Sequence, residues 1–164
     1  MNRMELVILS ISEQYGAALK MLENTITECT DDLWNDTAGD KIISQIAYHV
    51  LFWVDRYLSR TREEDYKFKP HLEQKDEKLI YSKKELLEYS NFVRKKADSW
   101  FNELKLDDLT SDSVYDFHGS TLLSSLIYDL RHIMLHVGAL HVRLYNVNKA
   151  PMEWESHNIL FKSD

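Results

Sequence analysis

The sequence predicts an all-α protein folded as a four-helix bundle. Four long segments carry apolar residues at alternating steps of three and four, which is the period of a helix with one buried face. Gly occurs only 4 times and Pro only twice, whereas sandwiches and barrels need many tight turns made by these residues. Four helices of roughly 20–27 residues bury their stripes most simply against one another. The 164 residues (1–164) are expected to form a single domain.

The first two helices are expected over residues 3–29 and 40–60. The first carries one stripe of buried positions, made of Ile8, Ser12, Tyr15, Leu19, Leu22, Ile26 and Cys29. The second carries a predicted core stripe made of Ile42, Ile46, His49, Val50, Trp53 and Tyr57. Both stripes follow the helical period, so each helix should turn one face to the core.

The third helix is expected to begin after Ser82, because Ser82 and Glu85 form a capping-box pattern, and to end near Leu104. The fourth is expected from about Ser120 or Thr121 to Asn146. It carries a seam made of Leu123, Leu126, Leu130, Ile133, Val137, Leu140 and Leu144. Further apolar residues lie on its other faces, namely Ile127, Met134, Leu135, Val142 and Tyr145. A helix that is apolar nearly all round is buried on two sides, so a homodimer is expected.

The connections between these helices are unequal in length. Residues 61–81 are charged, contain Pro70 and form a long crossover between the second and third helices. Residues 105–119 are acidic and polar, and the tail from Asn146 to Asp164 is expected to pack across the bundle. Long crossovers allow a bundle that is not simply up-down-up-down.

Composition limits the classes of partner. The formal net charge is -7, and no basic patch is visible, which argues against nucleic-acid binding because that binding depends on Lys and Arg. A lone cysteine, Cys29, excludes a disulfide framework and cysteine-based zinc modules. Neither a signal peptide nor a membrane span is recognisable, so we expect a cytoplasmic protein with no membrane partner.

Three histidines form the candidate site. His132 and His136 are one helical turn apart, about 40° round the axis and about 6 Å along it, so their rings can reach one point. His49 lies on the stripe of the second helix and can approach the same end of the bundle. Neutral imidazoles bind zinc, nickel, copper and iron, and three protein ligands leave positions open for water or substrate. The alternative interpretation is that these are hydrogen-bonded core histidines.

Neighbouring residues have candidate roles beside this trio. Asp129, one turn before His132, can accept the second ring N–H of His132 and fix its tautomer, or can be a solvated aspartate. Arg143 can meet an anionic substrate or form a surface ion pair. His118, just before the fourth helix, is placed at the rim of the site, whereas His141 should point away from it.

Two motifs resemble the DinB/YfiT-like superfamily of metal-binding four-helix bundles. The second helix contains His-x-x-x-Trp-x-x-x-Tyr, here from His49 to Tyr57. The fourth contains a run from His132 to Leu140 that resembles the family signature His-x-x-x-His-Arg-Gly-Gln-Leu, with Val137 and Ala139 in place of the Arg and Gln. The order and length of the segments extend this resemblance over essentially the whole chain.

The resemblance implies an up-down-down-up bundle, a dimer, and a divalent metal ion such as zinc, nickel or iron on His49, His132 and His136. It explains Gly138 as a point where the fourth helix lies close to a neighbour. It also implies a metal-dependent hydrolase, or a transferase acting on a low-molecular-weight thiol, with a small-molecule substrate that the sequence does not identify. The alternative is a non-catalytic stress-response module that binds a partner and in which the histidines are structural.

Overall fold

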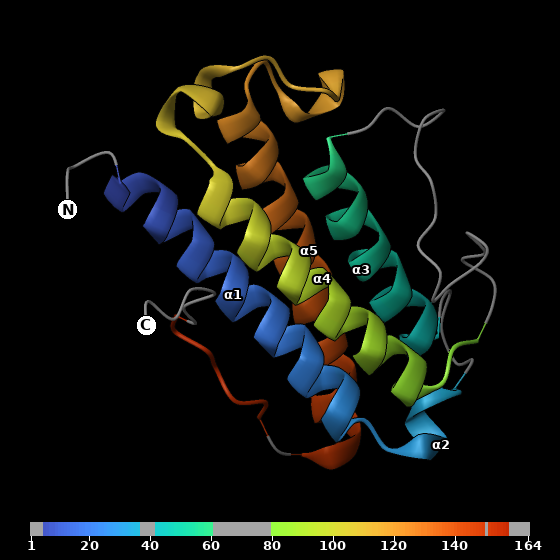
Figure 1. The fold of residues 1–164 in the computed structure, drawn as a ribbon. Coiled ribbons are helices and arrows are strands. Elements are labelled where there is room, and N and C mark those ends of the chain that lie inside the picture. The colour runs from blue at the N-terminus through green and yellow to red at the C-terminus, as the bar shows by residue number, and fades with distance from the viewer. Residues whose placement is uncertain (1–4, 37–41, 61–79, 150, 158–164) are drawn as a thin grey trace.

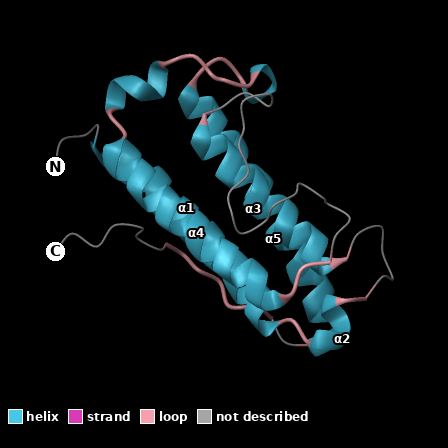
Figure 2. Cartoon of the chain, turned by 45° about the vertical axis from the view of Figure 1, so that its right-hand side comes forward, coloured by secondary structure: helices cyan, strands magenta, loops and turns pink. Residues whose placement is uncertain are grey.

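A computed structural model of the chain describes residues 5–36, 42–60, 80–149 and 151–157. Within these ranges the helices are the only regular secondary structure (Figure 2). One isolated β-bridge pairs Asp112 with Thr121. The all-α prediction is therefore confirmed for the described part of the chain. Its elements are α1 (Glu5–Glu28), α2 (Asp31–Trp34), α3 (Ile43–Ser59), α4 (Lys83–Glu103), the 3-10 turns η2 (Leu106–Thr110) and η3 (Asp116–His118), and α5 (Leu122–Asn148).

Four of the helices are long and lie alongside one another (Figures 1 and 2). α1 packs against α4 and α5, and α3 packs against the same two helices. The colours of Figure 1 show that α1 and α5 run toward the end where α2 lies, whereas α3 and α4 run away from it. α3 and α5 are therefore antiparallel neighbours, and this pairing brings the two halves of the candidate site together.

The helix starts follow the predicted capping chemistry. Ser82 precedes α4, and its Oγ accepts from the Glu85 backbone N–H at 3.3 Å while Glu85 Oε2 accepts from the Ser82 N–H at 2.8 Å. α5 starts after Thr121, whose Oγ1 accepts from the backbone N–H of Ser124 at 3.2 Å. These bonds satisfy donors that a helix start leaves free, which confirms the capping box predicted at Ser82.

The helix α2 was not predicted, although the sequence carries a signal for it. Thr30 caps this single turn, since its side chain accepts from the backbone N–H of Leu33, and Asp31 and Asp32 occupy the first turn. Acidic residues at this end are favoured by the helix dipole. The turn buries Leu33 and Trp34 in the hydrophobic core.

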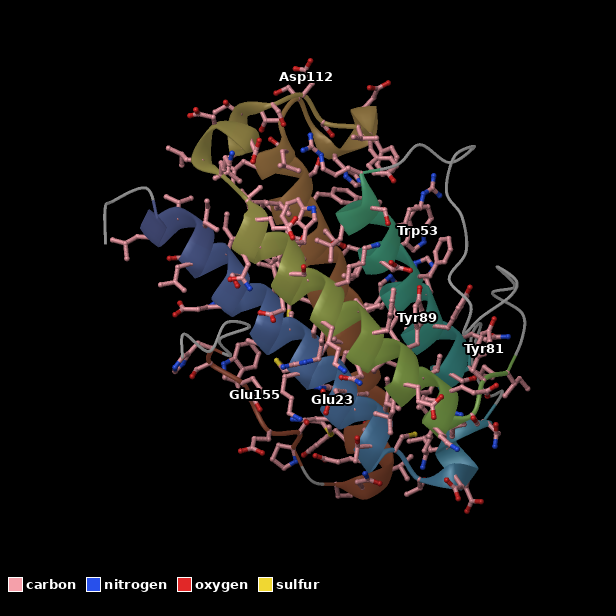
Figure 3. All side chains as sticks on the ribbon, viewed as in Figure 1. Glu23, Trp53, Tyr81, Tyr89, Asp112 and Glu155 are labelled. Carbon is pink, nitrogen blue, oxygen red and sulfur yellow. The ribbon has the colours of Figure 1, made fainter. Side chains whose placement is uncertain are left out.

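The core confirms the stripe of α1 and most of the seam of α5, but only part of the stripe of α3, of which Ile42 and Val50 are buried. The buried face of α3 is made of Ala47, Leu51, Val54, Asp55 and Leu58. Three of the residues predicted for its core, His49, Trp53 and Tyr57, are only half-buried. Figure 3 shows Trp53 on the side of α3 turned away from α4. His49 is therefore at the edge of the core, where solvent and ligands can approach.

A buried polar group fixes the orientation of α3. The carboxylate of Asp55 is 1% exposed, accepts from the Tyr89 hydroxyl at 3.0 Å and pairs with the ammonium group of Lys96 (Figure 3 labels Tyr89). Tyr89 and Lys96 both lie on α4. Breaking a buried pair of this kind is costly, so rotation of α3 about its axis is resisted. The face that carries His49 is thereby held toward α5.

The connections are described in part. Most of the predicted crossover, residues 61–79, lies outside the described residues. In the tail, Met152 packs against the core and the Gln14 side chain donates to the Ser156 carbonyl at 3.4 Å. The described part of the tail thus contacts the bundle as predicted, although Trp154 is largely exposed. None of the helices among the described residues combines the length and apolar character needed to cross a membrane.

Candidate metal centre

The three predicted histidines come together between α3 and α5. The Nε2 atom of His132 lies 3.2 Å from Nε2 of His49 and 3.1 Å from Nε2 of His136. The ring centroid of His49 is 5.2 Å from that of His132 and 5.0 Å from that of His136. All three side chains are half-buried, and one nitrogen from each lies within 4.8 Å of the other two. The rings thus converge on one point at the edge of the core.

The spacing of these nitrogen atoms suits a metal ion. Bonds of about 2.1 Å to a tetrahedral ion separate two ligand nitrogens by about 3.4 Å, and right-angled octahedral bonds separate them by about 3.0 Å. The two short distances, 3.2 and 3.1 Å, fall between these values. The donor set also fits, because neutral imidazoles are common ligands of zinc, nickel and iron.

Hydrogen bonding among the rings accounts poorly for this arrangement. Each ring nitrogen of a neutral histidine carries either one proton or one lone pair. His132 Nε2 has a close nitrogen on each side, so its single proton or lone pair has to be shared between His49 and His136. A cation at the common point would instead accept one lone pair from each ring.

Burial keeps the central ring in the state that a ligand needs. The pKa of His132 is lowered to about 4, first by burial and then by the neighbouring charges of His136 and His49. The ring is therefore neutral at physiological pH, and neutral imidazole is the form that binds metals. A hollow lined by Tyr128, Arg131, His132, Met134 and Leu135 opens on the adjacent face of α5. The hollow thus reaches one of the three candidate ligands, His132.

Asp129 lies in the core beside the trio, bonded to a residue that the sequence did not suggest. Its carboxyl group is fully buried, and Oδ2 accepts from the hydroxyl of Tyr15 on α1 at 3.0 Å. The other oxygen, Oδ1, is buried without a hydrogen-bond partner, as is Nδ1 of His132. Burial raises the pKa of Asp129 to about 7, although the Tyr15 bond opposes this shift. The predicted bond between Asp129 and His132 is not formed in this structure.

Two other predictions concern residues further along α5. Arg143 lies seven residues beyond His136, about 10 Å along the helix, and its charge acts on the thiol of Cys29 at the far end of α1. The role predicted for Arg143 beside the histidines stays a prediction. His141 faces α1, as predicted, and its Nε2 lies 3.0 Å from the hydroxyl of Thr25.

His118 is placed closer to the site than the sequence alone indicated. Its ring is 5% exposed and stacks on Tyr128 at 4.2 Å between centroids, with Tyr57 at 4.4 Å. Both of its ring nitrogens are buried without a hydrogen-bond partner. Trp53 connects this aromatic group to the histidine cluster, since its ring lies 5.3 Å from Tyr57 and 6.2 Å from His49. Trp53 and Tyr57 thus lie beside the candidate site and not in the core stripe predicted for them.

The resemblance implied that α5 lies close to a neighbour at Gly138, and no such neighbour is found among the described residues of one chain. A Cβ atom added there would meet nothing within 4 Å among the described residues, so none of them lies close to it. The neighbour that this glycine was expected to accommodate is therefore absent from the described part of the chain.

Comparisons with models of protein families, with curated proteins and with solved structures found no match to this chain. The interpretation of the histidine cluster therefore rests on its geometry and on the motifs described above.

We predict that His118→Phe makes the protein more resistant to acid. Burial lowers the pKa of His118 to about 4, whereas an unfolded histidine titrates near 6.5. As the pH falls through this interval, the unfolded state takes up a proton that the folded state does not, which costs the wild type about 2 kcal/mol by pH 5. Urea unfolding at pH 7.5 and pH 5 should show the free energy of unfolding falling less in the variant.

The control is His157→Phe at an exposed position, which should keep the wild-type dependence on pH. Equal losses of stability in His118→Phe and the wild type would show that His118 is not held neutral by burial.

Proposed function

We propose that this chain binds one divalent metal ion through His49, His132 and His136 and acts as a metal-dependent enzyme. The observation that carries the proposal is the convergence of three Nε2 atoms, two of them 3.1 and 3.2 Å from the third. The reaction we propose is hydrolysis, or transfer of a low-molecular-weight thiol to an electrophile. A bound divalent ion supplies Lewis acidity, which lowers the pKa of a water or thiol that it holds.

The proposal includes membership of the DinB/YfiT-like superfamily and its up-down-down-up four-helix bundle. The motifs from His49 to Tyr57 and from His132 to Leu140 support it. The directions of the four long helices agree with it, since α1 and α5 run one way and α3 and α4 the other (Figure 1).

The residues around the trio have definable tasks in such an enzyme. His49 is supplied by α3 and the other two ligands by α5, so the ion would bridge the two helices. The rings of Trp53 and Tyr57 shield one side of the site from water. The hollow beside His132 offers a substrate the apolar side chains of Met134 and Leu135 next to the reacting centre.

We predict near-stoichiometric metal in protein purified without a histidine tag. His49→Ala, His132→Ala and His136→Ala should each abolish high-affinity binding, because two imidazoles hold an ion far less tightly than three. Elemental analysis gives the metal content, and circular dichroism checks that each variant remains helical.

His141→Ala is the matched control, because His141 lies on the same helix but faces Thr25. It should retain the metal. Metal-free wild-type protein of normal stability would contradict the proposal and favour a non-catalytic binding module.

We predict that a thiol transferase would consume an electrophile only when a thiol is present. The metal-loaded protein is incubated with a chlorinated or epoxide compound, with and without a low-molecular-weight thiol, and loss of the electrophile is followed by chromatography. Equal loss without thiol would exclude the transferase and leave hydrolysis. No loss in either case, with an ester panel also inert, would contradict an enzyme of either kind.

We also propose that two copies of the chain associate through the outer face of α5. Large apolar residues are exposed along this helix, with Leu135 at 69%, Val142 at 61% and Tyr145 at 50%. Gly138 lies among them and has open space in front of it, so a second helix can approach closely there. This proposal supplies the neighbour that the monomer lacks.

We predict that Gly138→Leu converts the dimer to a monomer without disturbing the fold. An added Cβ atom meets none of the described residues within 4 Å, so the approach of a second copy is what the larger side chain should block. Light scattering at micromolar concentration measures the mass. Asn91→Leu, at an exposed position of α4 away from this face, is the control and should leave the dimer intact. A monomeric wild type would refute the association.

A further inference from the structure

A metal ion on His132 would determine where the proton of its ring lies. The atom near the other two rings is Nε2, so Nε2 is the atom that would bind the ion. The ring is neutral only if its remaining proton is on Nδ1. Nδ1 is buried and has no hydrogen-bond partner in this structure. Metal binding would therefore create a buried N–H donor that needs an acceptor.

The fitting acceptor lies one turn earlier on the same helix. Asp129 is three residues before His132, a spacing that makes two side chains neighbours on a helix. Its Oδ1 is buried and has no partner, so the unpaired donor and the unpaired acceptor lie in the same part of the core. A carboxylate that receives the second N–H of a metal-binding histidine fixes the tautomer and makes the ring a stronger ligand.

Tyr15 explains why this carboxyl group stays in place. Its hydroxyl, contributed by α1, is fully buried and lies 3.0 Å from Asp129 Oδ2 and 3.1 Å from the carbonyl oxygen of Leu126. The bond to Oδ2 leaves Oδ1 as the free oxygen. A contact with His132 would then use Oδ1, the oxygen that Tyr15 does not occupy.

We propose that Asp129 accepts the Nδ1–H of His132, and that Tyr15 holds Asp129 for this purpose, so that both are positioning residues of the metal centre. This inference rests on the proposed function and adds a chain of contacts from α1 to the ion. The other candidate partner is His118, which is near enough for its charge to act on His132 and whose ring nitrogens are also unpaired. The carboxylate is favoured because it is anchored by Tyr15, whereas the His118 ring is held by aromatic contacts alone.

The first experiment measures the tautomer of His132 by NMR on metal-free protein with ¹⁵N-labelled histidine. Wild-type protein should show the Nδ1–H tautomer with slow exchange of that proton, and Asp129→Ala should lose it. An unchanged tautomer in Asp129→Ala, or its loss in His118→Phe instead, would overturn the inference. Because no metal is present, a failure of this test would contradict the inference and leave the proposed metal site itself untouched.

The second experiment measures zinc affinity by competition with a chromophoric chelator. Asp129→Ala should bind zinc about 10–100-fold more weakly. Asp129→Asn should lose less, because its amide oxygen still accepts, and Tyr15→Phe should lose several-fold. His118→Phe is the control and should bind as the wild type does.

The two failures are distinguishable. If the wild-type protein binds no zinc, the proposed function is contradicted. If the wild type binds one zinc, and Asp129→Ala and Tyr15→Phe bind it with the same affinity as the wild type, only the inference is contradicted. Thermal melts accompany each titration. If Asp129→Ala does not fold, Asp129→Asn and Tyr15→Phe decide the question, because both nearly keep the volume of the native side chain. The inference would be refuted if both of these variants had the zinc affinity and the His132 tautomer of the wild type.

Discussion

The packing of α3 against α5 is the contact on which the candidate site depends. Metal–nitrogen bonds of about 2.1 Å tolerate displacements of only a few tenths of an ångström, so His49 has to be held in register with two residues of another helix. Polar contacts from the other two long helices, α4 and α1, hold α3 and α5 in place. Lys96 and Tyr89 of α4 hold Asp55 on α3, and Tyr15 of α1 holds Asp129 on α5. The register of the site is therefore set by all four long helices.

The half-buried position of the site reconciles two opposing requirements. A histidine in open solvent is partly protonated near neutral pH and competes poorly for metals, whereas a fully buried trio would be closed to substrate. At the edge of the core, burial lowers the pKa of His132 to about 4 while the face beside it still opens into a hollow. This edge exists because the deepest face of α3 is the one that carries Leu51 and Val54, next to the face that carries His49.

The features that could be predicted from the sequence are those determined by residues within one helix. The contacts between helices, which depend on how the helices are packed, could not be predicted. The Ser82 capping box and the seam of α5 are patterns within one helix, and both are confirmed. α3 is apolar on two adjacent faces, so periodicity could not decide which face is deepest, and packing against α4 and α5 decides it. The contact between Tyr15 and Asp129 joins residues 114 positions apart, and no local pattern contains that information.

The contrast between two histidines of α5 is the strongest argument against a purely structural interpretation of the trio. His141 is a half-buried histidine with ordinary hydrogen bonding, since its ring bonds to the Thr25 hydroxyl and to the backbone of Met21. His132 has the opposite surroundings: Nδ1 is buried without a partner, and Nε2 lies close to two other imidazoles. Unpaired buried polar atoms cost free energy and are rare in native cores. A ligand that engages Nε2 and directs Nδ1–H toward Asp129 would remove both defects at once, which is what a metal site at this position would do.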